Sequence, residues 1–168
     1  MDGQIVIFIM GVSGCGKTTI GQKLAASLDF AFYDGDDFHP EANIQKMQAG
    51  IPLNDEDRKP WLTSINEFVK KELPANNMVF ACSALKAVYR KWLEEGLESS
   101  VKWVFLKGEK DTILHRLQNR TGHFMPESLL DSQFETLETP QNALVVDVQM
   151  SPDEIITSIT QNLTTHGF

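Results

Sequence analysis

The stretch GVSGCGKT, residues 11–18, has the residue types and spacing of a loop that binds nucleotide phosphates. It fits the pattern G-x-x-x-x-G-K-[ST] at every fixed position. Its glycines let the backbone turn successive N–H groups toward an anion. We expect Lys17 to stabilise the β- and γ-phosphates as a catalytic cation, and Thr18 to bind Mg²⁺ through its hydroxyl. The residues predicted to bind the nucleotide in this loop are Gly11, Val12, Ser13, Gly14, Cys15, Gly16, Lys17, Thr18 and Thr19.

A second stretch, FYDGDDFHP at residues 32–40, brings three carboxylates and a histidine close together. Neighbouring acids repel one another, so folding alone gives little reason to cluster them. Near the phosphate loop, Asp34 would hold Mg²⁺ directly or through water, and Asp36 would accept the proton of a hydroxyl that is being phosphorylated. The alternative is a solvated turn that caps the next helix, which we prefer for Asp37. His39 either hydrogen-bonds the acceptor substrate or braces the turn.

The elements that must position these two stretches predict an α/β domain. Apolar runs predict strands buried in a sheet at residues 5–10, 31–33, 78–82, 101–106 and 144–146. Helices are expected directly after the phosphate loop, over 40–49, from residue 60, over 86–94, around 113–117, over 129–134 and from a capping box at 151–154. This alternation predicts a mainly parallel sheet with right-handed crossovers.

One further apolar run, LVVD at residues 144–147, resembles a strand that ends in a metal-binding carboxylate. It lies on the last predicted strand, so a strand-end or capping role is the preferred interpretation of Asp147. The strand that would more naturally lie beside the phosphate loop ends in Cys82 and Ser83, without an acid. The metal therefore needs a carboxylate from the acidic stretch.

Length, composition and charge narrow the classes of function. The 168 residues are close to the size of one domain, and 42% of them are hydrophobic, as in ordinary globular proteins. A net charge of −8 argues against a nucleic-acid partner. The two cysteines match no zinc spacing and are expected to be shielded thiols. The chain has neither a signal-peptide pattern nor a membrane-spanning apolar run, so we expect a cytoplasmic protein.

Six segments together resemble the gluconate kinase family: GVSGCGKTT, DGDDFHPEANIQKMQAGIPLNDEDRKPW, CSALKAVYR, VFLKG, RTGHFMPESLLDSQFETLE and LVVDV. They occur in the family's order and cover nearly the whole chain. The resemblance implies transfer of the γ-phosphate of ATP, with Mg²⁺, to the 6-hydroxyl of D-gluconate in carbohydrate acid catabolism. It implies a P-loop NTPase fold similar to adenylate and shikimate kinases, with a five-stranded parallel sheet flanked by helices. It also implies one domain (residues 1–168), a mobile lid at roughly residues 120–136 within it, and a homodimer.

An anionic polyol such as gluconate needs cationic anchors. Arg58 lies in NDEDRKPW, beside acids that would hold its guanidinium in place. Lys86 and Arg90 are four residues apart on a predicted helix, so they would share one face of it. Solvation at the surface is the alternative for each of these cations. On the family pattern, the residues predicted to bind the acceptor are Asp36, His39, Arg58, Lys86, Arg90 and His123.

Arg116 and Arg120 are also four residues apart, directly before TGHFMP. The resemblance implies that such arginines bind the nucleotide from a lid, neutralise charge on the transferring phosphoryl group and exclude water. Arg120 is therefore predicted to be catalytic, and a solvated helix face is the alternative. His123 and Phe124 either touch the substrate or pack when the lid closes, and the sequence does not decide between these roles.

Three other functions compete with this one. A shikimate kinase typically carries a glycine triplet after the third strand, where this chain has CSALK. A nucleoside monophosphate kinase normally has a G-[FY]-P-R motif near that strand, which is absent. A nucleotide-binding regulatory module without turnover need not keep Asp36, Arg58, Lys86 and the two lid arginines together.

Overall fold

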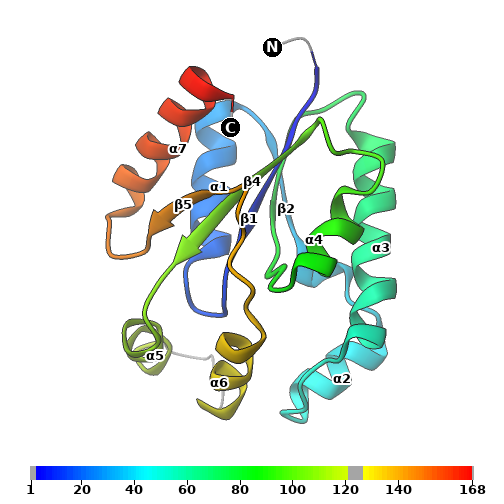
Figure 1. Cartoon of the computed structure of the whole chain (residues 1–168), viewed down its shortest axis with the longest axis vertical. Coiled ribbons are helices and arrows are strands. Elements are labelled where there is room, and N and C mark those ends of the chain that lie inside the picture. Colours follow the sequence, from blue (N-terminus) through cyan, green and yellow to red (C-terminus); the bar gives the residue numbers. More distant parts are fainter. Residues whose placement is uncertain (1–2, 121–126, 168) are drawn as a thin grey trace.

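The computed structural model describes residues 3–120 and 127–167, and its centre is a parallel sheet (Figure 1). The strands are β1 (Val6–Met10), β2 (Ala31–Asp34), β3 (Met78–Ala81), β4 (Val101–Lys107) and β5 (Leu144–Asp147). Their order across the sheet is β2-β3-β1-β4-β5, and every neighbouring pair is parallel. The predicted α/β class with a five-stranded parallel sheet is therefore confirmed.

Helices cover both faces of this sheet. α1 (Lys17–Leu28) and α7 (Pro152–His166) lie on one face, and α3 (Asp55–Glu72) and α4 (Ala87–Glu94) lie on the other (Figure 1). At the end where the strands finish lie α2 (Glu41–Gln48), α5 (Lys110–Gln118), α6 (Glu127–Thr136) and a short 3₁₀ helix, η1 (Gly35–Phe38). Ligands of open α/β sheets bind at this carboxyl end, so these smaller elements surround the expected site.

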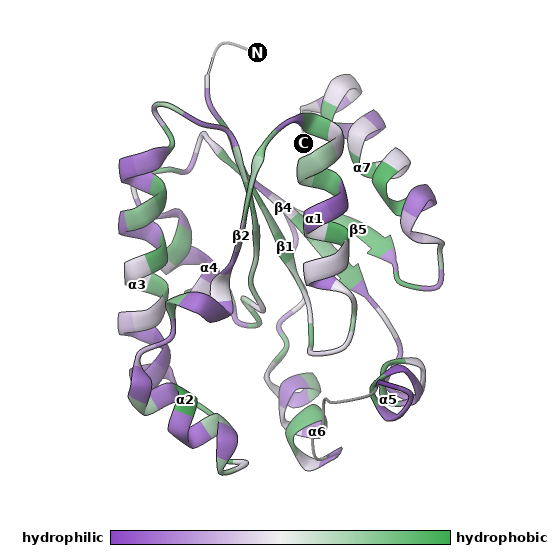
Figure 2. Cartoon of the chain, turned by 180° about the vertical axis from the view of Figure 1, so that it is seen from behind, coloured by the Kyte–Doolittle hydropathy of each residue, from purple (hydrophilic) through white to green (hydrophobic). Residues whose placement is uncertain are grey.

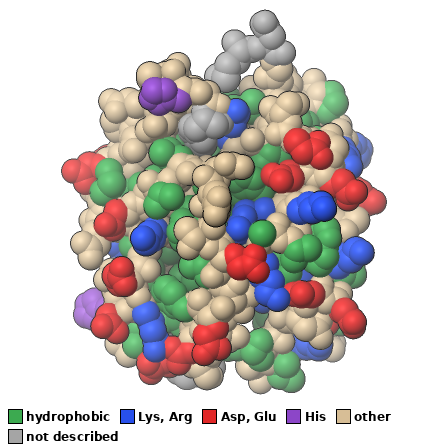
Figure 3. All heavy atoms as spheres, viewed as in Figure 1, with side chains coloured by type: hydrophobic (Ala, Val, Ile, Leu, Met, Phe, Trp, Pro, Cys, Tyr) green, Lys and Arg blue, Asp and Glu red, His purple; other side chains and the backbone are tan. Residues whose placement is uncertain are grey.

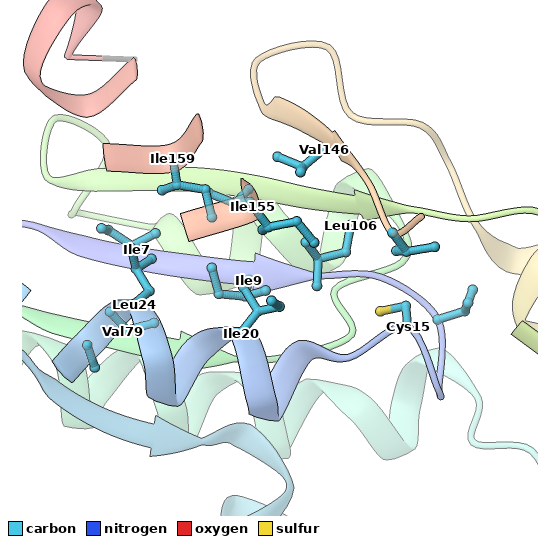
Figure 4. Packing of buried hydrophobic residues seen from close by; sticks show 14 of the residues in the cluster. Ile7, Ile9, Cys15, Ile20, Leu24, Val79, Leu106, Val146, Ile155 and Ile159 are labelled. Atoms are coloured by element: carbon cyan, nitrogen blue, oxygen red, sulfur yellow. The ribbon is translucent and has the colours of Figure 1, made fainter. Parts of the chain in front are cut away.

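The central strand β1 is buried along its whole length. Its residues Ile7 and Ile9 pack with α1 and α7, where they meet Ile20 and Ile155 (Figure 4). Phe8 belongs to the second core, which α3 and α4 cover. Successive side chains of a strand point to opposite faces, so only a continuous apolar run can supply both cores. Figure 2 shows strands with apolar residues between helices that carry hydrophilic residues.

The helix predicted to begin at Pro60 begins at Asp55 instead. The Asn54 side chain accepts the backbone N–H of Asp57 at 2.8 Å, and the Asp57 carboxylate accepts the N–H of Asn54 at 3.0 Å. This capping box fixes the start of α3. Proline is favoured at helix starts, which suggested the wrong boundary; Pro60 lies inside the helix. The earlier start places Arg58 in the first turns of α3, beside the carboxyl end of the sheet.

Several local predictions from the sequence are confirmed. Ser151 and Glu154 form a capping box at the start of α7. Asp147 is the last residue of β5, and its carboxylate accepts the N–H of Gln149. Both cysteines are buried free thiols, and burial raises the pKa of Cys82 to about 12, so this thiol stays protonated at neutral pH. Within the described residues, no helix has the length and apolar character needed to cross a membrane.

Candidate active site

The phosphate loop joins β1 to α1 at the carboxyl end of the sheet. Gly14 and Gly16 have φ angles of 80° and 100°, which residues with a side chain rarely adopt. A Cβ on Gly11 would lie 2.7 Å from Cys15 Sγ and 2.9 Å from the Leu106 carbonyl oxygen. The Cys15 side chain is therefore part of the packing beneath the loop, and only its backbone faces the site of an anion.

Lys17 lies over this loop. Its Nζ donates to the carbonyl oxygens of Gly11 and Val12, at 3.0 Å each. Ser13 is tied to α6 through both ends of one amide: its N–H donates to Gln133 Oε1 at 2.7 Å, and Gln133 Nε2 donates to Ser13 Oγ at 3.2 Å. The loop is thus connected to the helix that follows the expected lid arginines.

The first acid of the FYDGDDFHP stretch reaches the phosphate loop. Thr18 Oγ1 donates to Asp34 Oδ2 at 2.9 Å, although these residues come from α1 and β2. A hydroxyl beside one carboxylate fits Mg²⁺, which keeps several waters and binds proteins through one or two carboxylates together with substrate phosphates. Among the described residues, no group of three His, Cys, Asp or Glu side chains could enclose a metal. One hydroxyl and one carboxylate suit a metal that arrives with a nucleotide.

Asp34 also makes the cap that we expected of Asp37. Its Oδ1 accepts the backbone N–H of Asp36 at 3.0 Å and so caps the 3₁₀ helix. The next helix, α2, begins after Pro40 without a side-chain cap. Asp37 is exposed on this turn, as expected, but the capping role predicted for it is wrong, because the Asp34 carboxylate at the end of the strand accepts the free N–H.

Asp36 extends into the open cleft, with 81% of its side chain exposed. His39 Nε2 lies 3.7 Å from its Oδ1, and Lys17 lies across the cleft. The interaction with His39, followed by the charge of Lys17, lowers the pKa of Asp36. Catalytic hydrogen bonds are often long before a substrate binds, so 3.7 Å does not remove His39 from this role. At neutral pH the Asp36 carboxylate is ionised and free to accept a proton.

A cavity of about 270 Å³ lies between the phosphate loop, η1, the start of α3 and α6. It brings together polar residues from all of these elements: Ser13, Lys17, Asp36, His39, Arg58, Ser83 and Gln133. The sequence suggested that neighbouring acids hold the Arg58 guanidinium, but the structure shows other contacts. Its Nε donates to the Leu53 carbonyl at 3.2 Å, and its guanidinium lies over the Tyr89 ring, 5.1 Å from the centroid. Asp55 instead binds Lys86 and the Tyr89 hydroxyl.

The structure separates Lys86 and Arg90, which the sequence placed together. Lys86 is the N-cap residue of α4, outside the helix, and lines a neighbouring open groove with Asp55. Arg90 is 8% exposed, and its guanidinium donates to the carbonyl oxygens of Ala84, Leu85 and Glu138. The prediction that Lys86 and Arg90 share one helix face is therefore wrong, because α4 begins at Ala87 and Lys86 precedes it. Arg90 ties the entry of α4 to the segment after α6 and does not line the cavity that holds Asp36.

A second cavity of about 270 Å³ lies on the other side of the phosphate loop. Arg116 and Arg120 line it, together with loop glycines and the start of α7. Arg116 also donates to the Val148 carbonyl. Arg120 lines in addition a cavity that holds Lys17 and Asp34. The two arginines therefore line cavities next to the phosphate loop; His123 and Phe124 lie outside the described residues.

Comparison with known proteins identifies the family. The shikimate kinase family model matches residues 13–164. The thermosensitive gluconokinase of Escherichia coli (strain K12) is 52% identical over 84% of this chain and 75% of its own length, and a probable gluconokinase of Dictyostelium discoideum is 46% identical over 94% and 86%. The crystal structure of a gluconokinase from Sinorhizobium meliloti 1021 has a TM-score of 0.85 at 39% identity, covering 99% of this chain and 100% of that one. The chain belongs to the gluconokinase family.

Within this family, the match to the shikimate kinase model reflects the shared fold. A solved shikimate kinase from Aquifex aeolicus is only 17% identical, with a TM-score of 0.63 over 97% of this chain. Likeness at that level shows the architecture alone, whereas gluconokinases share 39–52% of their residues with this chain in the comparisons above. The shikimate-type alternative is therefore not favoured.

Three residues near the gluconokinase site were missed in the sequence. Gln133 contacts the phosphate loop, Trp61 donates to the Gly35 carbonyl at 2.7 Å, and Asn43 approaches His39. Asn43 and Gln133 lie in the segments that carry the family resemblance. Their membership of these segments was the only signal in the sequence that could have indicated a role in the site.

Replacing Arg90 by alanine should destabilise the protein and leave the acceptor site intact. The carbonyl oxygens of Ala84 and Glu138 would lose their side-chain donor, and that of Leu85 would keep only the Glu138 N–H, which together costs on the order of 2–4 kcal/mol of unfolding free energy. Urea unfolding measures this loss, and Lys91→Ala at the exposed neighbouring position is the matched control. Unchanged stability together with a greatly raised KM for the acceptor would instead make Arg90 a substrate ligand.

Proposed function

We propose that this protein is a gluconokinase, which transfers the γ-phosphate of ATP to the 6-hydroxyl of D-gluconate and releases 6-phospho-D-gluconate and ADP. The observation that carries the proposal is a single cavity that holds a phosphate-binding lysine, an ionised carboxylate and an arginine. Membership of the gluconokinase family supports the same reaction. A regulatory module without turnover would need none of these groups to face one another.

The cavity suits an acceptor that is both a polyol and an anion. Arg58 supplies a positive charge at the end away from the phosphate loop, and its guanidinium lies over the Tyr89 ring. This local charge offsets the net charge of −8, which would otherwise repel an anion. We assign the gluconate carboxylate to Arg58 and the opposite, hydroxyl end to Asp36. His39 and Lys86 remain secondary candidates for the acceptor hydroxyls, and His123 rests on the family resemblance alone.

In the proposed reaction, Asp36 accepts a hydrogen bond from the 6-hydroxyl and aims its oxygen at the γ-phosphorus. Lys17 and the inward N–H groups of the loop stabilise the charge that develops on the β- and γ-phosphates. Asp36 then takes the hydroxyl proton as the new O–P bond forms and the bond to ADP breaks. Thr18 and Asp34 would hold Mg²⁺, which would neutralise charge on the nucleotide phosphates.

The nucleotide would extend from the phosphate loop into the second cavity. Arg116 lies there against the start of α7, and Arg120 lies between this cavity and Lys17. A guanidinium in that position offers a planar cation to a base or a phosphate. From the family resemblance we also propose a lid at roughly residues 120–136, a homodimer and a cytoplasmic location.

The direct test is an ADP-release assay with a panel of sugar acids and polyols. D-gluconate with ATP and Mg²⁺ should give turnover, and shikimate and nucleoside monophosphates should not. Lys17→Ala should reduce the rate by about 10²-fold or more, because a cation that stabilises the transferring phosphoryl group is lost. Near-normal turnover by that variant, or turnover of another acceptor alone, would overturn the proposal.

Replacing Arg58 by alanine should impair the use of gluconate far more than the binding of ATP. Loss of one partner from a charge-assisted contact in a closed site costs on the order of 30- to 1000-fold in kcat/KM. Lys59→Ala, which removes an exposed cation from the next position, is the control and should change kcat/KM little. Equal KM values for gluconate in both variants would contradict the role of Arg58.

The three acids of the FYDGDDFHP stretch should differ in their effects. Asp36→Asn keeps the shape but loses the basic oxygen, so kcat should fall by roughly 10²-fold or more while ATP still binds. Asp34→Asn keeps an oxygen for the 3₁₀ cap but loses charge beside Thr18, so the Mg²⁺ concentration needed for activity should rise. Asp37→Asn should be mild. Steady-state rates across a Mg²⁺ series measure all three, and a large loss in Asp37→Asn alone would mean that the wrong carboxylate was assigned.

A further inference from the structure

Behind the exposed Asp36 lies a histidine that is almost completely buried. The His39 side chain is 3% exposed, and its Nε2 faces Asp36 Oδ1. Its ring stacks on Trp61, with centroids 3.8 Å apart and planes inclined by 21°. The ring is therefore fixed in orientation, and its two nitrogens have different neighbours.

The other nitrogen, Nδ1, faces Asn43 on α2. Asn43 is 2% exposed, and its Nδ2 lies 3.2 Å from His39 Nδ1 and 2.9 Å from the Asp57 carbonyl oxygen. A carbonyl oxygen only accepts hydrogen bonds, so the Asn43 atom beside it must be the NH₂ nitrogen. The second hydrogen of that nitrogen is directed at His39 Nδ1, which must then accept it. A neutral His39 ring consequently carries its proton on Nε2, toward Asp36.

We propose that Asn43 is a positioning residue for phosphoryl transfer, which fixes His39 as the Nε2–H tautomer so that this N–H holds the Asp36 carboxylate toward the acceptor hydroxyl. The inference rests on the proposed function in giving Asp36 the hydroxyl proton. It adds that Asn43, which touches no substrate, sets the orientation of the Asp36 carboxylate through His39.

The other charged groups around the pair are cations or carboxylates that already have partners. Lys17 from α1 and Arg58 from α3 line the cavity with Asp36 and His39, and Arg120 after α5 lines a cavity with Asp36. Asp34 is engaged by Thr18, and Asp57 is engaged by Lys46, so neither carboxylate competes with Asp36 for the ring. A second N–H on the ring would point at the Asn43 NH₂ group, which is itself a donor.

Asn43 is itself held by the connection between α2 and α3. The Lys46 ammonium contacts both carboxylate oxygens of Asp57, at 2.8 and 2.9 Å, and Asp57 closes the capping box of α3 with Asn54. Because the Asp57 carbonyl orients Asn43, the first turn of α3 orients His39. That same turn carries Arg58. The acceptor anchor and the acceptor base are therefore positioned by one rigid unit.

The chain offers a matched control in Asn66, the second fully buried asparagine among the described residues. It is 5% exposed, and its Nδ2 donates to the carbonyl oxygens of Leu93 and Glu95, at 2.8 and 3.1 Å. Its amide reaches no residue of the site. Asn66→Asp therefore makes the same chemical change, a buried NH₂ group replaced by a carboxylate oxygen facing carbonyls, without touching His39.

The first measurement is the tautomer of His39, read from ring ¹⁵N chemical shifts at pH 8, with the resonance assigned by its loss in His39→Gln. The wild-type ring should be protonated at Nε2. In Asn43→Asp the new carboxylate can only accept a hydrogen bond at this position, so the ring should become protonated at Nδ1 and its signal should change accordingly. An Nδ1–H ring in the wild type, or no change in Asn43→Asp, overturns the proposal.

The second measurement compares the kinetics of the same variants. Asn43→Asp should lower kcat by roughly 10- to 100-fold, with the KM for gluconate changed by less than about 3-fold, because the reacting carboxylate loses its donor. Asn66→Asp should lose thermal stability to a similar extent and keep both kcat and the His39 signal. Equal losses of kcat in the two variants would mean that Asn43 acts through stability alone.

Two further controls keep the test decisive. If Asn43→Asp does not fold, Asn43→Ala leaves Nδ1 without a donor and should give a mixture of both tautomers with the same loss of kcat. An unmixed Nε2–H signal with normal kcat in that variant overturns the proposal. Failure of the proposed function would give a different result, because the wild-type protein would then not turn over gluconate. The ¹⁵N shifts of His39 would still show which ring nitrogen carries the proton.

Discussion

The contact between Gly35 and the end of β3 is the constraint on which the site depends. β2 and β1 are not neighbours, so the acids after β2 must approach the phosphate loop across β3. A Cβ on Gly35 would lie 2.8 Å from the Ala81 carbonyl oxygen and 3.2 Å from Cys82 Cβ. Trp61 holds the Gly35 carbonyl from α3. Only a glycine there lets Asp34 reach Thr18 and lets Asp36 enter the cleft beside it.

A protein with a net charge of −8 that acts on anions must concentrate its cations. Acidic and basic side chains alternate over the face seen in Figure 3, without one large basic patch. Several lysines near the carboxyl end of the sheet are paired with acids: Lys46 with Asp57, Lys86 with Asp55, and Lys110 with two acids of α6. Arg58 is instead fixed by a carbonyl and an aromatic face, so its charge is not cancelled. Because Arg58 lines the cavity, its charge gives an acidic protein a local site that attracts an anion.

The parts of the fold that follow local rules could be predicted from the sequence. The phosphate loop, the five strands and the capping box of α7 depend on short patterns, and Asp34 and Asp36 follow from the end of a strand. The predicted start of α3 was wrong because it was based on Pro60, whereas the capping box of Asn54 and Asp57 sets the start. Arg90 was misplaced for another reason: a buried arginine that serves three carbonyls has the same sequence signal as one that binds a ligand.

The lowered pKa of Asp36 bears on how it would assist the proposed reaction. Its carboxylate stays ionised at neutral pH and becomes protonated only as the pH falls through that lowered value, so it is always available but is a weak base. Strong proton abstraction would call for a raised pKa, as in buried catalytic acids. Phosphoryl transfer through a loose transition state needs little proton abstraction before the bond to phosphorus forms, and the position of the attacking oxygen matters more. An exposed carboxylate has no packing to hold it in place. A buried histidine with one defined N–H supplies that hold, and for this reason the geometry behind Asp36 matters more than its basicity.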